Sequence, residues 1–511
     1  MKNLNISYRQ KFYARFIRPN SIITLPIIVF LILHIIRPFS VGLYHDDWAL
    51  FNVHILEPSE KFWEFFEFGD RPIYGWILCA MNILSNGNPV VITIISSLFV
   101  ATSAYSLYQL NLRITGLVGR PIKSAASVGT AMWIAIPWGF GYSLWPTGAA
   151  TLPAIILYLW SCIFTIDYIT KNRNIYLVIS IILTALSYLT YQATYLGFVP
   201  LLGLIVAFKS LNKASVYQIL RVLIYSSIIL GLSVLRTSLD TPKQIAFNIK
   251  YLFGNPLYAM PKAIIESFGD LWVFFLLLTL ALMVLLVQCL AKMEKRSRCR
   301  FLLGFASCLV GIAISTTTYS CTGYVLSGTG VFSRTMISAS IWLAIMFTLV
   351  VTLFISELNF CKRLYAIWVY FLLVFTMTIA SGFQLTGWMR SWDRQQKILA
   401  TFPTDFFSNM PSESVLLLDE PRHIGGIEVF AAHWDITSAV YMLPEMRNYA
   451  RFEKRAQIVP LFTDYPMHWD GFSSLEIRPA QSLPAKKVWI YKPSNNSLRE
   501  LYGESLIRPT N

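Results

Sequence analysis

Long apolar runs limit what this chain can fold into more than any other feature of its sequence. Hydrophobic residues make up 55% of the 511 residues and charged residues only 14%, which excludes an ordinary soluble protein. Many runs approach the roughly 20 residues that an α-helix needs to cross a bilayer. We therefore expect a polytopic all-α membrane protein with about eleven transmembrane helices, at residues 21–39, 89–110, 124–142, 149–168, 175–190, 193–208, 218–235, 271–291, 301–319, 336–356 and 364–385.

The charged residues between these runs indicate the orientation of the chain. A net charge of +15 is also typical of nucleic-acid binding, but no RNA- or DNA-binding motif accompanies it, and no nucleic-acid partner is predicted. The basic residues instead gather in short connectors, which face the cytoplasm in membrane proteins. The N-terminus, with five basic residues before residue 21, and the connector at residues 292–300 are therefore predicted to be cytoplasmic.

The composition changes after the last apolar run, so we expect two domains, a transmembrane domain at residues 1–385 and a C-terminal domain at residues 386–511. A helix is predicted over residues 392–407, and alternating or apolar runs predict strands at residues 414–419 and 487–491. This pattern indicates a small α/β domain outside the cytoplasm. No GxGxxG, P-loop or CxxC motif occurs, so no cofactor is predicted.

The most informative polar stretch follows the first apolar run, at residues 44–71, and we call it the acidic loop. It opens with His45-Asp46-Asp47-Trp48. Two adjacent carboxylates at a membrane surface are costly, because each loses hydration and each repels the other. We therefore interpret Asp46 and Asp47 as catalytic. Farther along, residues 59–68 place glutamates on one helical face and phenylalanines on the other, which predicts an interfacial helix, and residues 72–84 predict a second interfacial or re-entrant one.

The predicted topology limits the chemistry of the acidic loop. Nucleotide sugars and ATP are generally absent outside the cytoplasm, so a group transfer there needs a donor that has crossed the membrane, most simply a lipid-linked one. A polyprenyl phosphate sugar would bind cations through its phosphodiester. A carboxylate would take the proton of the acceptor hydroxyl. The external cations predicted by this topology are Arg71, Arg236, Lys243, Lys250, Lys262 and Arg334.

At these positions the chain resembles the GT-C membrane glycosyltransferases, and more narrowly the bacterial serotype-converting O-antigen glucosyltransferases. The resemblance rests on Asp46-Asp47-Trp48, on Gly69-Asp70-Arg71-Pro72, which departs from a GRP-like motif by the inserted Asp70, and on Tyr191-Gln192. These motifs cover about the first two hundred residues. The resemblance implies catalysis or substrate positioning by Asp46 and Asp47, and binding by Arg71, Tyr191 and Gln192.

The family implies an enzyme of the bacterial inner membrane with its C-terminal domain in the periplasm. Such an enzyme transfers a single hexose, typically glucose, with inversion, from undecaprenyl phosphate to O-antigen of lipopolysaccharide. Its functional partners would be a small flippase and the polyprenyl phosphate glucosyltransferase that makes the donor. Together with the predicted external cations, this gives a set of candidate substrate-binding residues, namely His45, Trp48, Arg71, Tyr191, Gln192, Arg334 and Lys243.

Several alternatives stay open at this point. Either aspartate could be the base, and a divalent cation at this loop stays open, although no motif supports one. Arg71 could simply pair with Asp70 or Glu67, and Arg334 could be an interfacial anchor. Aromatic belts at membrane interfaces offer a structural explanation for Trp138, Trp145 and Trp388. An O-antigen polymerase or ligase is the alternative enzyme, and a flippase or transporter is disfavoured because the spans contain few ionisable residues.

Overall fold

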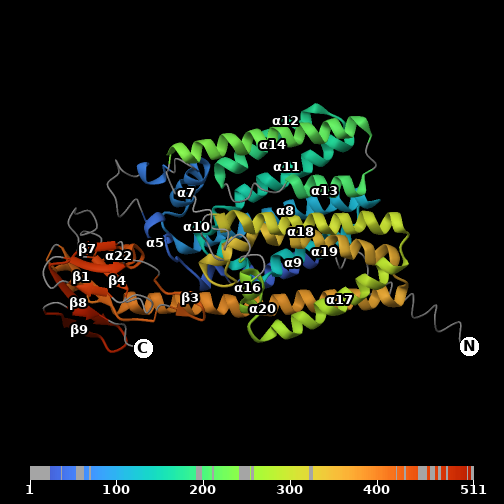
Figure 1. Ribbon diagram of the computed structural model, residues 1–511. Helices are drawn as coiled ribbons and strands as arrows, with labels where there is room; N and C mark the ends of the chain where they lie inside the picture. The colour runs from blue at the N-terminus through green and yellow to red at the C-terminus, as the bar shows by residue number, and fades with distance from the viewer. Residues whose placement is uncertain are drawn as a thin grey trace, which may run out of the picture.

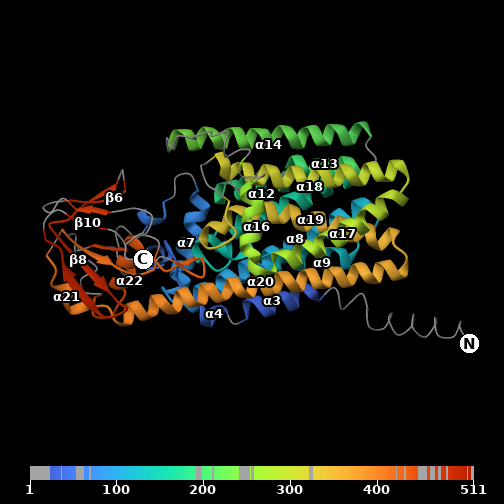
Figure 2. The same cartoon turned by 60° about the horizontal axis from the view of Figure 1, so that its bottom comes forward.

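The computed structural model shows a long bundle of helices with small β-sheets at one end (Figure 1). Its long helices lie side by side, and one of them, α20, continues from the bundle into the sheet-containing part (Figure 2). The structure describes residues 24–35, 37–52, 63–67, 71–191, 198–209, 212–240, 254, 258–321, 326–411, 413–421, 423–430, 433–446, 457–460, 467–469, 474–478, 481–502 and 505–507.

Within the described residues, six helical segments are long and apolar enough to cross a membrane, which supports an integral membrane protein. They are α8 (Pro89–Val118), α10 and α11 (Pro146–Ala149 and Leu152–Lys171), α16 and α17 (Met260–Phe268 and Trp272–Lys292), α18 (Lys295–Cys321), α19 (Ile337–Glu357) and α20 (Phe360–Ala400). Shorter apolar helices accompany them, namely α3 (Leu25–His34), α7 (Pro72–Ser85), α12 (Asn174–Thr190) and α13 (Phe198–Phe208). Helix α14 (Lys213–Asp240) packs against α11, α12 and α13.

Asparagines mark several helix boundaries. Asn86 and Asn172 end α7 and α11 in the left-handed conformation, which asparagine tolerates better than most residues. The Asn88 side chain accepts hydrogen bonds from the N–H groups of Val90 and Val91, and so caps the start of α8. The short Asn86-Gly87-Asn88 turn therefore separates α7 from α8, as the polar interruption in the sequence predicts.

Prolines shorten two predicted spans. The predicted helix over residues 21–39 is described as α3, which ends at His34, followed by α4 (Arg37–Ser40). Pro38 has no N–H to donate to the carbonyl of His34, so the helical hydrogen-bond pattern is interrupted there. The span predicted over residues 124–142 is likewise α9 (Lys123–Ala135) followed by the 3-10 helix η3 (Pro137–Tyr142), so its second half is not α-helical.

Two other boundaries also differ from those predicted. The basic residues after Lys292 do not form a mere connector, because α18 already begins at Lys295 and includes most of them. The helix predicted over residues 364–385 and the first part of the one predicted over 392–407 are a single helix, α20, which runs without a break from Phe360 to Ala400. No proline or glycine pair interrupts residues 386–391 to end it. The end of the second prediction falls in a separate short helix, α21 (Thr404–Ser408).

The interfacial helices predicted in the acidic loop are only partly described. Helix α7 corresponds to the run predicted at residues 72–84. Of residues 59–68, the structure describes 63–67, which contain the 3-10 turn η2 (Glu64–Phe66). Phe66 is buried while Glu64 and Glu67 are exposed, as predicted from glutamates on one helical face and phenylalanines on the other. The remaining residues of the predicted helix, 59–62 and 68, lie outside the described residues.

Helices α9 and α19 form the centre of the bundle. Every residue of α9 from Ala125 to Ala135 is buried, and most of α19 is buried too. The two helices approach closely at Gly129, where an added Cβ would lie 2.0 Å from Thr348 Oγ1 and 2.7 Å from the carbonyl oxygen of Ala344. Small residues allow this approach in membrane helices, where packing drives association.

The C-terminal part contains both strands that the sequence predicts. β1 (Ser414–Leu418) and β8 (Lys487–Lys492) pair in parallel, in a sheet of order β4-β1-β8-β9 with β4 (Gln457–Pro460) and β9 (Ser497–Glu500). Strand β1 is entirely buried, as a continuous apolar run in a parallel sheet predicts. A second sheet is antiparallel and has the order β10 (Ser505–Ile507), β5 (Met467–Trp469), β6 (Ser474–Arg478), β7 (Gln481–Pro484). A third sheet consists of β2 (His423–Ile424) and β3 (Ile427–Glu428).

This C-terminal part contacts the start of the acidic loop. Helix α22 (His433–Tyr441) packs against both β4 and α5 (Asp47–Leu50). Strands β2 and β3 contact α20. The fold therefore brings a helix from the end of the chain next to the two aspartates that follow the first helix.

Candidate functional site

The two adjacent aspartates follow a strained backbone position. His45 has a φ of 51°, in the left-handed region, which is unfavourable for a residue with a large side chain. Asp46 then precedes α5 as its N-cap residue, and Asp47 is the first residue of that helix. Strain of this kind clusters at functional sites, where the surrounding structure maintains it.

Asp47 is completely buried and connects the acidic loop to α10. Its Oδ2 accepts a hydrogen bond of 2.9 Å from the Tyr44 N–H, while its Oδ1 accepts bonds of 2.9 and 2.5 Å from the N–H and hydroxyl of Thr147. Burial raises the pKa of Asp47 to about 8, although these hydrogen bonds oppose the rise. Asp47 therefore holds the loop in place, and its carboxyl oxygens face protein groups.

Asp46 is the accessible member of the pair, with 37% of its side chain exposed. Its Oδ1 lies 2.9 Å from His45 Nδ1. Burial alone would lower the pKa of His45, but the Asp46 contact and the charges of Asp435, Asp46 and Glu428 outweigh it and raise the pKa to about 9. At neutral pH the loop thus presents an exposed carboxylate beside a histidine cation.

Trp145 joins this pair to Arg334. The Trp145 ring packs edge-on against His45 at 5.7 Å, and its indole N–H donates to the Tyr44 carbonyl at 3.1 Å. The Arg334 guanidinium lies 4.5 Å from the centre of the same ring, within cation–π range. The aromatic belt considered as an explanation for Trp138, Trp145 and Trp388 does not fit the structure, because all three are buried in protein.

The turn that carries Arg334 is held in place by its neighbours. Arg334 belongs to the 3-10 helix η7 (Val331–Met336), which packs against η3. The Gly141 N–H donates a 2.9 Å hydrogen bond to the Ser333 hydroxyl. A Cβ at Gly141 would lie 2.3 Å from that hydroxyl, so only glycine allows this approach. Arg334 is thus fixed by the turn around it.

Arg71, just before α7, lies close to two tyrosine rings. Its guanidinium is 5.3 Å from the ring centre of Tyr74 and 5.8 Å from that of Tyr191. Pro72 occupies the first helical position, where its lack of an N–H costs nothing. The structure therefore brings together Arg71 and Tyr191, two predicted binding residues that are far apart in the sequence.

Tyr74 links Arg71 to the acidic loop. The Arg71 guanidinium lies 5.3 Å from its ring centre, and its hydroxyl donates a 3.1 Å hydrogen bond to the Thr147 carbonyl. Thr147 in turn binds Asp47. Contacts therefore run from Arg71 through Tyr74 and Thr147 to Asp47, and from Arg334 through Trp145 and His45 to Asp46. No sequence motif marks Tyr74 or Thr147 as a functional residue. Tyr74 is notable only for its nearness to Arg71, and Thr147 only for following Pro146.

Trp48 does not belong to the accessible surface of this site. It is buried, and its indole N–H donates a 3.0 Å hydrogen bond to the Gln395 side chain of α20. Its ring also stacks on Trp392 at 5.7 Å. The predicted residues Gln192 and Lys243 lie outside the described residues.

The C-terminal part contributes two carboxylates that the sequence did not single out. Asp435 of α22 and Glu428 of β3 both act electrostatically on His45. Asp435 is fully buried. No spacing or motif relates these residues to the acidic loop, because almost four hundred residues separate them; only the packing of α22 on α5 brings them near.

Three of these side chains also have the chemistry of metal ligands. A ring nitrogen of His45 and one carboxylate oxygen each from Asp46 and Asp435 all lie within 4.8 Å of one another. Such a set of nitrogen and carboxylate ligands suits a divalent transition metal. The same carboxylates would also stabilise a protonated His45 imidazole without any metal. This geometry alone therefore does not assign a metal.

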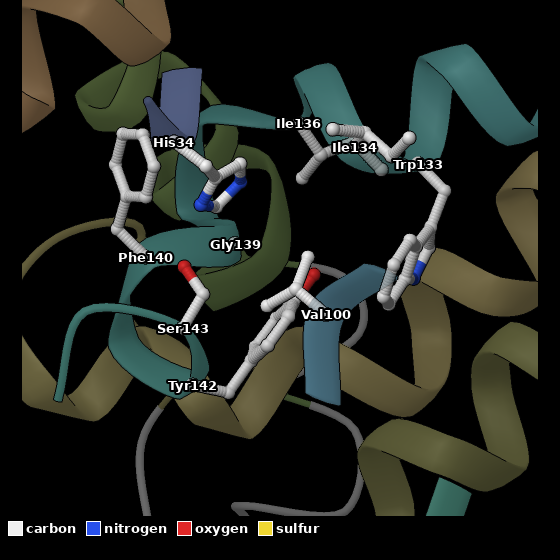
Figure 3. A pocket seen from close by; sticks show the side chains of 9 residues that line it. All are labelled: His34, Val100, Trp133, Ile134, Ile136, Gly139, Phe140, Tyr142 and Ser143. Atoms are coloured by element: carbon white, nitrogen blue, oxygen red, sulfur yellow. The ribbon is translucent and has the colours of Figure 1, made fainter. Parts of the chain in front are cut away.

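A small cavity lies elsewhere in the bundle (Figure 3). His34, Phe140, Ser143 and Tyr142 line it together with apolar residues, and it has room for about one water molecule. None of the predicted site residues lines it. The cavity therefore contributes nothing to the grouping around Asp46.

Comparison with known proteins finds likeness only among solved structures. No protein-family model and no curated protein matches the chain. A crystal structure of ArnT from Cupriavidus metallidurans bound to undecaprenyl phosphate is similar over 85% of this chain and 88% of its own, with a TM-score of 0.43 and 8% sequence identity. A likeness of this size assigns neither a family nor an activity.

Proposed function

We propose that this chain is a membrane glycosyltransferase that transfers a single sugar from a polyprenyl phosphate donor, with Asp46 as the general base. The observation that carries the proposal is the row of contacts from exposed Asp46 through His45 and Trp145 to Arg334. Arg71 is tied to the same loop through Tyr74 and Thr147. An accessible carboxylate beside two phosphate-binding cations suits transfer from a phosphodiester donor to a hydroxyl. The motif resemblance of Asp46-Asp47-Trp48 and Tyr191-Gln192 supports the same activity.

The reaction follows from these roles. Asp46 takes the proton of the acceptor hydroxyl as the hydroxyl oxygen attacks the anomeric carbon. The new glycosidic bond forms while the bond from the anomeric carbon to the phosphate oxygen breaks, and that oxygen leaves with the electron pair. Attack opposite the leaving group inverts the anomeric centre. Arg71 and Arg334 stabilise the charge that develops on the polyprenyl phosphate.

The finer assignment follows the family resemblance. The sugar is a hexose, most simply glucose, on undecaprenyl phosphate, and the acceptor is O-antigen or a related surface polysaccharide. The acidic loop and C-terminal part face the periplasm from the bacterial inner membrane, with the N-terminus cytoplasmic. A small flippase and a polyprenyl phosphate glucosyltransferase supply the donor.

The test uses purified full-length chain with polyprenyl phosphate glucose and O-antigen acceptor. The proposal predicts release of polyprenyl phosphate together with addition of one branch sugar to each repeat unit that reacts. Longer polysaccharide without a branch sugar would instead identify a polymerase. Comparing the glycan composition of cells with and without the chain identifies the native sugar, since a missing side-branch sugar reveals donor and acceptor together.

Replacing Arg334 with Ala is expected to raise the KM for the donor on the order of tenfold to a hundredfold, because a charge-assisted hydrogen bond is worth about 1.5–3 kcal/mol. Arg334→Lys should recover part of the loss, since lysine keeps the charge without the planar fork. The measurement is steady-state kinetics with donor and acceptor varied separately. Arg173→Ala, on the exposed turn before α12, is the matched control. An unchanged donor KM in Arg334→Ala would exclude Arg334 from the phosphate site.

A further inference from the structure

The C-terminal part places a buried carboxylate against the proposed catalytic loop. Asp435 lies in the first turn of α22, which packs on α5, the helix that begins at Asp47. Its side chain is fully buried, and one of its carboxylate oxygens lies within 4.8 Å of a His45 ring nitrogen and of an Asp46 carboxylate oxygen. A buried carboxylate is stable when a cation lies close to it.

Hydrogen bonds from α20 fix this arrangement from the other side. The Gln395 side chain accepts from the Trp48 indole N–H and donates to the Val429 carbonyl at 2.6 Å. The Ser391 hydroxyl donates to the Glu428 carbonyl at 2.7 Å. One helix thus binds both the start of the acidic loop and the strand that precedes α22. The C-terminal part is attached at a defined position next to His45.

The backbone of His45 needs such support. Its φ of 51° is unfavourable for a histidine, so contacts around the side chain must maintain it. Groups near the His45 side chain include the Trp145 ring, Asp46 and Asp435, and the charge of Glu428 also acts on it. Asp435 and Glu428 come from the C-terminal part, and Asp435 has a carboxylate oxygen within 4.8 Å of a His45 ring nitrogen. Losing this carboxylate would allow His45, and with it Asp46, to move.

We propose that Asp435 is a positioning residue, which holds His45 so that Asp46 keeps the orientation needed to take the acceptor proton. The proposal rests on the function proposed above and gives the C-terminal part a role in catalysis. Asp435 itself is buried and does not touch substrate. It acts through His45, so its effect depends on His45 being present.

A double-mutant cycle tests this dependence. We would measure kcat and KM of purified wild type, Asp435→Asn, His45→Gln and the double variant. Each single variant should lower kcat on the order of tenfold to a hundredfold, with little change in donor KM, because small displacements of a reacting group have effects of this size. The double variant should be no slower than the slower single variant, since both changes disrupt one interaction. Asp435→Glu should recover part of the rate.

Asp393→Asn is the matched control, because Asp393 is an exposed aspartate of α20. Within the described residues its ion-pair partner is Lys397. Asp393→Asn should keep the wild-type rate. Thermal unfolding of every variant shows whether the fold is intact, and Asp435→Ser, which also removes the carboxylate, replaces Asp435→Asn in the cycle if the latter is unfolded. A purely structural role for Asp435 would lower stability without any dependence on His45.

The possible outcomes separate this proposal from the function on which it rests. A wild-type chain that transfers no sugar refutes the proposed function. An active wild type in which the two effects multiply in the double variant refutes the role of Asp435. Loss of wild-type activity with EDTA and its recovery with Mn²⁺, together with a higher Mn²⁺ requirement in Asp435→Asn, would also overturn it, because the three side chains would then bind a metal.

Discussion

Replacing Asp46 with Asn is expected to lower the rate of sugar transfer by about 10²–10⁴-fold, the range typical for loss of a general base. Asparagine has nearly the same shape but cannot take the acceptor proton. Because Asp46 is 37% exposed and makes no capping hydrogen bond to α5, Asp46→Asn should still fold, with only a small change in thermal unfolding from the altered contact with His45. The measurement is kcat of the purified variant with saturating donor and acceptor.

The control for this variant is Asp270→Asn, an exposed aspartate in the 3-10 helix η6 (Gly269–Leu271), outside the site. It should transfer sugar at the wild-type rate. If Asp46→Asn also kept full activity, the base would have to be sought elsewhere, and the grouping of Asp46 with the two arginines would have lost its proposed role.

Replacing Asp47 with Ala should act on stability rather than on chemistry. The substitution removes the acceptor of three buried hydrogen bonds, from the N–H of Tyr44 and from the N–H and hydroxyl of Thr147. We expect the free energy of unfolding to fall by about 3 kcal/mol or more, because each buried donor that loses its acceptor costs about 1–3 kcal/mol. Thermal unfolding in detergent measures the change.

The pH dependence of the free energy of unfolding gives a second test of the role of Asp47. Its folded pKa of about 8 lies above the ordinary value of 3.8, so the folded state binds the proton more tightly than the unfolded state. The stability contributed by this group is therefore complete below pH 3.8 and is lost as the pH rises toward 8. Asp47→Asn should lack this loss, so its stability relative to wild type should improve between pH 5 and 8. A constant difference across this range would show that Asp47 is ionised in the fold.

Local signals in the sequence were sufficient for much of the fold. Apolar length predicted the major helices, the Asn86-Gly87-Asn88 turn separated α7 from α8, and the apolar runs at residues 414–419 and 487–491 became paired strands. The errors have local causes as well. Pro137 ended α9 early within a run that hydropathy alone reads as continuous. Helix α20 continues into the C-terminal part because nothing in its polar half breaks it.

Only some of the site residues could be predicted from the sequence, and their arrangement could not. The cost of adjacent carboxylates indicated Asp46 and Asp47, but not which of them is accessible, since that depends on Thr147, a hundred residues away. Arg71 and Tyr191 were predicted separately, and the packing of α7 on α12 brings them together. Asp435 had no sequence signal, because its relation to His45 exists only in the folded chain.

The most direct test of the account asks on which side of the membrane Asp46 lies. An Asp46→Cys chain in sealed, right-side-out membrane vesicles would be treated with a membrane-impermeant maleimide, and the labelled peptides identified by mass spectrometry. The exposed native cysteines Cys299 and Cys361, in predicted cytoplasmic regions, are internal controls. We predict that position 46 is labelled in sealed vesicles, while these two react only after permeabilisation. Labelling of position 46 only after permeabilisation, together with Cys299 and Cys361, would contradict the account.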